Sequence, residues 1–345
     1  MRKLGSIAAL VLSLGAVSPA GASSSLVSIG SGLQGPKGLR ATVYATGLPH
    51  VSAFALDGKG RLWVTTSAAS GHGADGVWLV ASAGAKPVKV ISGLAGPLGL
   101  VWHAGTLYVA SIGRVDAFSG LHGTRFATRS KILAEPSGHG WNQNLVLAQS
   151  GRLIMSIASA CDHCTTTSRW SASIISFDLD GSQVQTYASR VRAAFGLAFY
   201  PGTSTLLASM NQRDDLGSQT PGDTLAVVRA GQDWKFPGCY GQGGSVCSGV
   251  PAVLATLGKH AAAGSVAVVT GQLGSTTGTA ALVSEWQLGT VQRVALTGAA
   301  SSLSGGTPTT ILRGFKNPLP VLVRAGGTLL VGDWTTGVIY RIAPA

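Results

Sequence analysis

Short apolar stretches alternate with polar, glycine-containing turns along most of this chain, a pattern typical of β-strands rather than helices. One phrase recurs: an apolar strand, a turn containing glycine, and a second strand that ends in small or polar residues. The clearest copy runs from Ser52 to Thr66. Six copies are recognised, the fifth with an insertion, over residues 52–66, 98–111, 144–157, 195–209, 264–285 and 319–333.

The spacing of the copies indicates the architecture. Most second strands lie 44 to 53 residues apart, which is the length of one four-stranded blade of a β-propeller. A single blade exposes apolar faces, and radial stacking of blades buries them. Outer strands are expected between the copies, for example at residues 76–81, 172–177 and 225–229. Six copies predict an all-β, six-bladed propeller of four-stranded blades around a central channel.

The two ends of the mature chain are expected to share one blade. Residues 41–44 would pair with residues 337–341 and so close the ring. The longer gap between the fourth and fifth copies predicts an insertion near residues 231–262. Because no linker separates the copies, residues 23–345 are expected to form a single domain.

Composition supports an all-β chain and narrows its partners. Glycine accounts for 49 of 345 residues and charged residues for only 11%, a glycine content about twice the average. The formal net charge of +12 reflects few acids, 13 against 25 bases. No run of lysine or arginine exceeds two residues, and basic and aromatic residues do not interleave. The pattern therefore indicates a solvated basic surface and argues against nucleic acid as a partner.

The N-terminus resembles a secretory leader. Arg2 and Lys3 precede an apolar stretch from Leu4 to Val17, and small residues follow it. Residues 1–22 are therefore predicted to be a signal peptide, with a retained N-terminal anchor as the alternative. The stretch is shorter than the roughly 20 apolar residues of a membrane span. We expect a secreted or periplasmic protein with no membrane span.

Four cysteines occur as Cys161 with Cys164 and Cys239 with Cys247. An even count in an exported chain favours disulfides, and the two local pairs are the preferred connectivity. A zinc or redox role for Cys161-x-x-Cys164 is the alternative, but zinc needs a second group of ligands at suitable spacing.

Unusual polar residues interrupt the repeat in three loops, at residues 138–144, 190–196 and 211–217. In a propeller such loops converge at one end of the channel, where ligand sites are expected. With the phrase Gly231-Gln-Asp-Trp-Lys-Phe-Pro-Gly-Cys-Tyr-Gly241, these loops follow one another in the order found in a known family. The chain resembles the glucose/sorbosone dehydrogenases, soluble propellers that use pyrroloquinoline quinone (PQQ) and calcium.

The resemblance implies a set of site residues. His139 would be the general base for oxidation of an aldose-type sugar, and Arg192 would neutralise the reduced quinone. The other cofactor contacts would come from Asn142, Arg213, Trp234 and Lys259. Backbone carbonyls of Gln212 and Arg213 would hold calcium, which accepts such oxygens readily. Electrons would pass to an external acceptor.

Several positions depart from the family pattern. The loop of His139 is one residue longer than expected, and Ala193 stands where an asparagine often follows the arginine. No acidic residue at positions 157–161 supports the base. Arg192 has an alternative role in an ion pair with Asp214 or Asp215. Trp286 and Trp334, after the fifth and sixth inner strands, are expected to pack the channel rather than to bind sugar.

Two other functions remain open. The first is a catalytically silent propeller that binds a carbohydrate or a protein in the same channel. The second is a propeller lactonase, which would require a cation held by several acidic side chains, more than these loops provide. A basic channel mouth would favour the dehydrogenase, whereas a channel filled by tryptophans would favour the silent binder.

Overall fold

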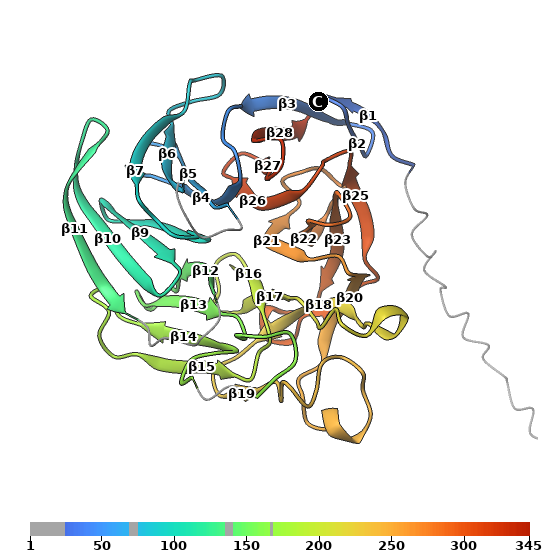
Figure 1. Ribbon diagram of the computed structural model, residues 1–345. Coiled ribbons are helices and arrows are strands. Elements are labelled where there is room, and N and C mark those ends of the chain that lie inside the picture. The colour runs from blue at the N-terminus through green and yellow to red at the C-terminus, as the bar shows by residue number, and fades with distance from the viewer. Residues whose placement is uncertain (1–24, 69–74, 135–140, 166–167) are drawn as a thin grey trace, which may run out of the picture.

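The computed structural model describes residues 25–68, 75–134, 141–165 and 168–345, and almost every regular element in them is a β-strand (Figure 1). The short 3-10 turns are η1 (Gly217–Gln219), η2 (Ser245–Cys247) and η3 (Ala300–Ser302). None of the helices in these ranges is of the length and apolarity that crossing a membrane requires.

Within the described ranges the strands form six sheets, and each begins at an inner strand and continues outward. Neighbouring strands are antiparallel except at one outer edge, where the pair is parallel. Two sheets are formed by consecutive strands. The first contains β4 (Val51–Leu56), β5 (Leu62–Thr66), β6 (Gly76–Val80) and β7 (Val88–Ser92), and the second contains β8 (Gly99–His103), β9 (Thr106–Ser111), β10 (Arg114–His122) and β11 (Arg125–Ala134). A third sheet skips one strand and contains β16 (Ala194–Phe199), β17 (Leu206–Met210), β18 (Gly222–Val228) and β20 (Val253–Lys259).

The other three sheets contain strands that are distant in sequence. The first contains β12 (Asn142–Leu147), β13 (Leu153–Ile157), β14 (Ser173–Phe177), β15 (Gln185–Ser189) and β19 (Gln232–Asp233). The second contains β26 (Pro318–Arg324), β27 (Thr328–Asp333), β28 (Val338–Pro344) and β3 (Leu39–Ala45). The third contains β21 (Ala263–Thr270), β22 (Thr279–Glu285), β23 (Thr290–Thr297), β25 (Thr309–Arg313), β2 (Leu33–Gly35) and β1 (Val27–Gly30), and β24 (Ser304–Gly305) pairs with β23.

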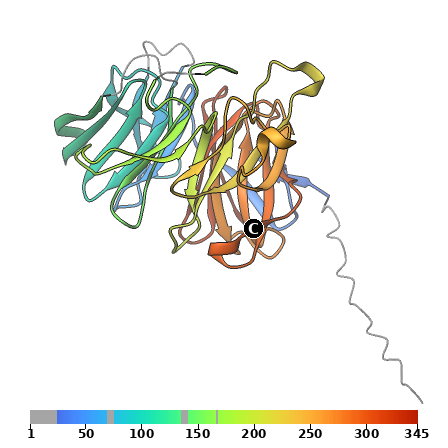
Figure 2. The same cartoon turned by 90° about the horizontal axis from the view of Figure 1, so that it is seen from below.

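The inner strands contact one another in a closed ring. Strand β4 meets β8, β8 meets β12, β12 meets β16, β16 meets β21, β21 meets β26, and β26 returns to β4. Figures 1 and 2 show the sheets arranged around this ring, seen along and across its axis. The prediction of an all-β propeller is therefore confirmed. Each repeated phrase forms the first two strands of one sheet, as predicted.

The predicted closing contact is also confirmed. Strand β3, near the N-terminus, pairs with the C-terminal strand β28, with Val43 opposite Tyr340 and Ala41 opposite Ile342. The two ends of the chain thus complete one sheet. Joining them by backbone hydrogen bonds leaves no gap in the ring.

Two sheets are larger than the four strands that were predicted. The hairpin of β1 and β2 continues the β21 sheet, where Gln34 pairs with Arg313. This extension buries Ile29 and Leu33 against Leu312, which explains why it forms. Strand β19 adds a parallel edge to β15, and β20 completes the β16 sheet. The expected insertion near residues 231–262 thus supplies strands to two sheets, and the excursion beyond them spans residues 234–252.

Apolar side chains from adjacent sheets fill the space between them. One cluster joins the β8 and β12 sheets through Tyr108, Leu145, Met155 and Phe177. Each large apolar side chain that is fully buried stabilises the fold by about 1.5–3 kcal/mol. This packing, repeated around the ring, holds the sheets together and keeps the loops at the channel mouth in place.

Glycine in the repeated phrase allows the inner strands to approach closely. A Cβ atom at Gly196 would lie 2.6 Å from the carbonyl oxygen of Gly264 on the next sheet and 2.6 Å from Ser209 Oγ. Gly196 is therefore required by the crowding at the axis, where strands β16 and β21 meet.

Candidate functional site

A cavity of about 550 Å³ lies on the propeller axis, and residues from all six sheets line it. The contributions of the successive sheets include Ser67, Leu98, Trp141, Ala193, Ala262 and Leu319. Most of these residues belong to the short segments that precede or follow inner strands. The cavity has the size of a small-molecule site and lies where the three polar loops were expected to converge.

Aromatic side chains make up much of the cavity wall. Trp141, Phe195, Trp286 and Trp334 all line it. The rings of Trp286 and Trp334 meet edge to face with centroids 5.6 Å apart, and His50 packs on Trp334 at 4.4 Å. Trp334 Nε1 donates to the carbonyl oxygen of Ser67 at 2.9 Å, which fixes that ring. These tryptophans form walls around a cavity and leave it open.

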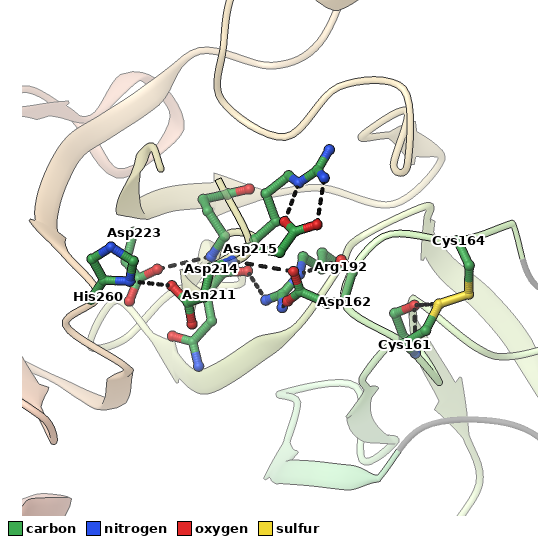
Figure 3. A network of polar contacts seen from close by, with 12 residues as sticks. Cys161, Asp162, Cys164, Arg192, Asn211, Asp214, Asp215, Asp223 and His260 are labelled. Atoms are coloured by element: carbon green, nitrogen blue, oxygen red, sulfur yellow. Dashed lines mark hydrogen bonds and ion pairs between the residues drawn. A yellow bond between two sulfur atoms is a disulfide. The ribbon is translucent and has the colours of Figure 1, made fainter. Parts of the chain in front are cut away.

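Among the described residues of the lining, the two charged side chains are Arg192 and Asp162, and they form an ion pair. Arg192, which precedes β16, is bound by Asp162, and the side chain of Arg192 is only 14% exposed (Figure 3). Its Nη2 donates to Asp162 Oδ1, and its Nε donates to the carbonyl oxygen of Asp162 at 3.0 Å. Its Nη1 donates to the carbonyl oxygen of Asn211 at 2.9 Å. All three guanidinium nitrogens are therefore engaged.

The expected partner of Arg192 was wrong. Asp215 binds the guanidinium of Arg213 at 2.6 Å, and Asp214 lies 3.2 Å from His260 Nδ1. The acid that reaches Arg192 is Asp162, from the disulfide loop 30 residues earlier. The sequence did not indicate this ion pair, because Cys161 and Cys164 explain the loop as a disulfide and no spacing rule links Asp162 to Arg192.

Two buried polar groups in the cavity wall have no partner among the described residues. They are Asn211 Oδ1 and Gln143 Oε1. The backbone N–H of Asn211 donates to the carbonyl oxygen of Ala193 at 2.9 Å, so the position of Asn211 is fixed by the fold. A buried polar group without a partner is destabilising unless a ligand or water satisfies it. Both oxygens lie beneath the cavity surface, so either could accept a hydrogen bond from a bound molecule once its side chain turned toward the cavity.

A buried acid beside the site ties two sheets together. Asp223 accepts the backbone N–H groups of Gln212 and Ala263, each at 2.8 Å. Burial raises the pKa of Asp223 to about 6, although these two donors and Arg192 oppose the shift. Figure 3 shows Asp223 beside the loop of Asn211 and Asp214. Its role is to position this loop against the start of β21.

The disulfides are formed as predicted, between Cys161 and Cys164 and between Cys239 and Cys247. Cys161 itself lines the cavity. In the described ranges, no group of three or more His, Cys, Asp or Glu side chains is placed to hold a metal ion. The zinc alternative for this cysteine pair therefore has no support there.

Of the residues predicted to bind the cofactor, Arg192 reaches the cavity and several others do not. Arg213 is buried, its guanidinium is bound by Asp215 and lies 4.7 Å from the ring of Tyr240, and it holds the pKa of Asp215 well below its usual range. Trp234 belongs to the apolar core of the β16 sheet. Lys259 Nζ donates to the carbonyl oxygen of Ser218 at 3.1 Å.

The remaining predicted residues complete this picture. Gln212 lines a separate void of about 70 Å³ together with Trp234. His139 lies outside the described residues, and Asn142 is described only as the first residue of β12. Both stay predictions.

Comparison with known proteins identifies the fold. No family model and no curated protein matches the chain. Solved structures do: an oxidoreductase (glucose dehydrogenase) from Thermus thermophilus matches with a TM-score of 0.72 at 18% identity, over 88% of this chain and 100% of that one. The PQQ-bound aldose sugar dehydrogenase of Streptomyces coelicolor matches with a TM-score of 0.71 at 16% identity, over 90% and 99%. The holo PQQ domain of pyranose dehydrogenase from Coprinopsis cinerea gives 0.72 at 16%, over 90% and 97%.

These matches bear out the resemblance noted in the sequence at the level of the fold. The chain is a propeller of the kind found in PQQ-dependent sugar dehydrogenases. Fold kinship does not by itself determine what a site does. Whether the cavity could hold PQQ therefore depends on the charges and hydrogen-bonding groups of its own residues.

The lining does not fit PQQ well. The cofactor has three carboxylates, whereas Arg192 is the one lysine or arginine that the described residues place in this wall, and Asp162 already balances its charge. Residues 69–74, 135–140 and 166–167, which lie outside the described ranges, include no lysine or arginine. Three carboxylates would have no matching cations here, which is unfavourable in a partly buried site.

Proposed function

We propose that this protein binds a neutral, aldose-type sugar in the cavity at the channel mouth. The observation that carries the proposal is the composition of the wall: three tryptophans line it together with polar side chains, and its described charges cancel as one ion pair. The six sheets would be the six blades of a single-domain propeller spanning residues 23–345. Each blade contributes to the one site.

The chemistry of a sugar matches this wall. A pyranose has apolar C–H faces that pack on aromatic rings, and its hydroxyl groups both donate and accept hydrogen bonds. Trp286 and Trp334 provide ring surface, while Asn211 Oδ1 and Gln143 Oε1 are acceptors without partners among the described residues. A turn of either amide toward the cavity would let its oxygen accept a sugar hydroxyl, and the buried oxygen would then be satisfied.

Calorimetric titration of the mature protein with D-glucose and other neutral aldoses tests the proposal. We expect saturable binding that weakens at least tenfold in Trp334→Ala and Trp286→Ala. The matched control is Trp78→Ala, since Trp78 lies on β6, outside the cavity. Sugar binding that is absent, or that weakens equally in all three variants, would contradict the proposal.

Oxidation of the bound sugar is the second candidate. It is favoured by the position of Arg192 on the cavity wall, at the residue that the motif resemblance indicated, and by PQQ-bound structures with the same fold. This candidate would need PQQ and calcium for the redox chemistry, although the described lining does not match the three carboxylates of PQQ, and an external acceptor for the electrons. Addition of PQQ and calcium should then produce aldose-dependent dye reduction that is lost in His139→Ala. A lack of PQQ binding at micromolar concentration would leave sugar binding as the function.

Export from the cytoplasm is part of the proposal. Two disulfides between local cysteine pairs support it, because such bonds persist in oxidising compartments. The predicted signal peptide at residues 1–22 agrees with this location. Mass spectrometry of the secreted protein would show a mature N-terminus near Ser23, and an uncleaved chain held in the membrane would favour the alternative of an anchor.

A further inference from the structure

Asp162 is held on Arg192 from several directions. One carboxylate oxygen accepts from Arg192 Nη2, and the other accepts the backbone N–H of Asp214 at 3.2 Å. The carbonyl oxygen of Asp162 accepts from Arg192 Nε. Figure 3 shows the two side chains facing each other beside the loop of Asn211 and Asp214. Several hydrogen bonds therefore fix the ion pair of Asp162 and Arg192 in the cavity wall.

The loop that carries Asp162 is itself fixed. The disulfide between Cys161 and Cys164 closes it over four residues. His163 Nε2 lies 3.1 Å from the carbonyl oxygen of Pro237, and its ring packs edge-on against Tyr240 with centroids 5.8 Å apart. Just before the loop, the backbone N–H of Ser159 donates to the carbonyl oxygen of Arg192 at 2.6 Å. Asp162 is thus presented to Arg192 by a rigid support.

We infer that Asp162 determines the charge selectivity of the cavity, by making it accept neutral ligands and reject carboxylate-bearing ones. The inference builds on the proposed sugar site and specifies its ligand class. It also accounts for the disagreement between the fold, which PQQ-dependent enzymes share, and the lining, which does not fit PQQ.

The physical reason lies in competition for one guanidinium. A ligand carboxylate that approached Arg192 would meet the charge of Asp162 at the same group, and like charges at contact distance repel. No other lysine or arginine among the described residues of the wall would compensate. A sugar hydroxyl can use the remaining N–H groups of Arg192 without this repulsion. Replacement of Asp162 by asparagine keeps the shape and an acceptor oxygen while removing the charge.

Calorimetric titration with D-glucose, D-glucuronate and PQQ tests this inference, because the two sugars differ mainly by one carboxylate. We expect the wild-type protein to bind glucuronate at least tenfold more weakly than glucose. In Asp162→Asn, glucuronate affinity should rise at least tenfold, and PQQ affinity should rise in the same direction. Adding Arg192→Gln to this variant should abolish both gains, because the released guanidinium is their cause.

The control is Asp180→Asn, which removes an equal charge from an exposed turn and should leave all three affinities unchanged. Circular dichroism and a thiol assay establish that each variant is folded with its disulfides intact. If Asp162→Asn does not fold, Asp162→Ser is used with the same measurements. A folded Asp162 variant with wild-type affinity for glucuronate and PQQ overturns the inference.

The outcomes separate this inference from the proposed function. If no variant binds glucose but Asp162→Asn gains PQQ binding, Asp162 sets the charge selectivity and the sugar proposal fails. If glucose binds to both proteins and anion affinity does not change, the sugar proposal stands and Asp162 has no role in selectivity.

Discussion

Carboxylates serve different purposes on two sides of the ring. In the sheets of β4–β7 and β26–β28, toward the top of Figure 1, buried acids accept backbone N–H groups. Asp75 accepts from Ala68 and Gly96 at 2.7 and 2.9 Å. Asp333 accepts from Lys316 and Thr336 at 2.6 and 3.1 Å. These acids hold loops against strands.

In the sheets of β12–β15 and β16–β20, toward the bottom of Figure 1, several acids bind arginine side chains instead. Asp162 binds Arg192, Asp215 binds Arg213, and Asp233 binds Arg190. Both disulfides also lie on this side. Two acids depart from this division. Asp223 follows the first pattern, with two backbone donors. Asp57, between β4 and β5, accepts the backbone N–H groups of Lys59 and Arg61 and also binds Arg61 Nε at 2.7 Å.

The difference shows where this fold has room for function. A buried acid that accepts several backbone N–H groups is part of the scaffold, since replacing it leaves those donors without partners. Asp162, paired with Arg192 at the cavity, accepts one backbone N–H, that of Asp214, so changing it breaks fewer backbone hydrogen bonds. The side with arginine pairs and longer loops is therefore the side where specificity can vary.

The largest expected effect comes from the scaffold side. Asp333→Ala should lower the free energy of unfolding by about 4 kcal/mol, because it leaves the backbone N–H groups of Lys316, Asn317 and Thr336 without their acceptor. Urea unfolding followed by tryptophan fluorescence measures this. Asp180→Ala, in an exposed turn, is the control and should change stability by less than about 0.5 kcal/mol. Similar losses of stability in the two variants would mean that a buried acid with backbone donors stabilises the fold no more than an exposed acid does.

The second effect is the pH dependence of folding stability that the buried side chain of Asp223 should cause. Its pKa is raised from 3.8 to about 6 by burial, so the folded protein holds this proton more tightly than the unfolded chain does. The resulting stability is fully present below pH 3.8 and is lost as pH rises through about 6. Its size is about 3 kcal/mol, at roughly 1.4 kcal/mol per pKa unit.

Comparison of the wild-type protein with Asp223→Asn isolates this contribution. Urea unfolding at pH 4, 5, 6 and 7 should show the wild-type protein losing stability relative to the variant across this range, since asparagine does not titrate. A constant difference between the two proteins would mean that Asp223 is already ionised at pH 4, held by its two backbone donors.

The smallest effect tests the longer loops. Cys239→Ser with Cys247→Ser should lower stability by about 2 kcal/mol, because the bond closes a short loop with a sequence separation of eight residues. Thermal unfolding measures the change, and reducing agent should lower the melting temperature of the wild-type protein in the same direction. Sugar affinity should stay within about twofold, because neither cysteine lines the cavity. A loss of sugar binding would show that this loop supports the site.

The strands and the ring could be predicted from the sequence because their signals are local or repeated. Alternation and glycine-containing turns located β4 with β5 and β26 with β27, and six repeats implied a closed ring. The hairpin of β1 and β2 was missed because its two short strands, four and three residues long, carry little alternation of their own. Its place is decided by burial of Ile29 and Leu33 against another sheet.

The site was predicted in part. Arg192 was placed correctly on the cavity wall, since it precedes an inner strand at the converging end of the channel. Arg213 and Lys259 were expected there from their loops, but each side chain turns to a nearby acceptor, Asp215 or the carbonyl oxygen of Ser218. Side-chain direction within a loop depends on such partners, and motif spacing does not encode it.

By itself, the sequence determined the all-β propeller, the closing pair of β3 and β28, the two disulfides and the position of Arg192 at the channel. These follow from periodicity, chain ends and local cysteine spacing. Only the tertiary structure decided that Asp162 forms an ion pair with Arg192 and that tryptophans from different blades line one cavity. Those contacts join residues far apart in sequence, and they depend on how the sheets pack around the axis rather than on any local pattern.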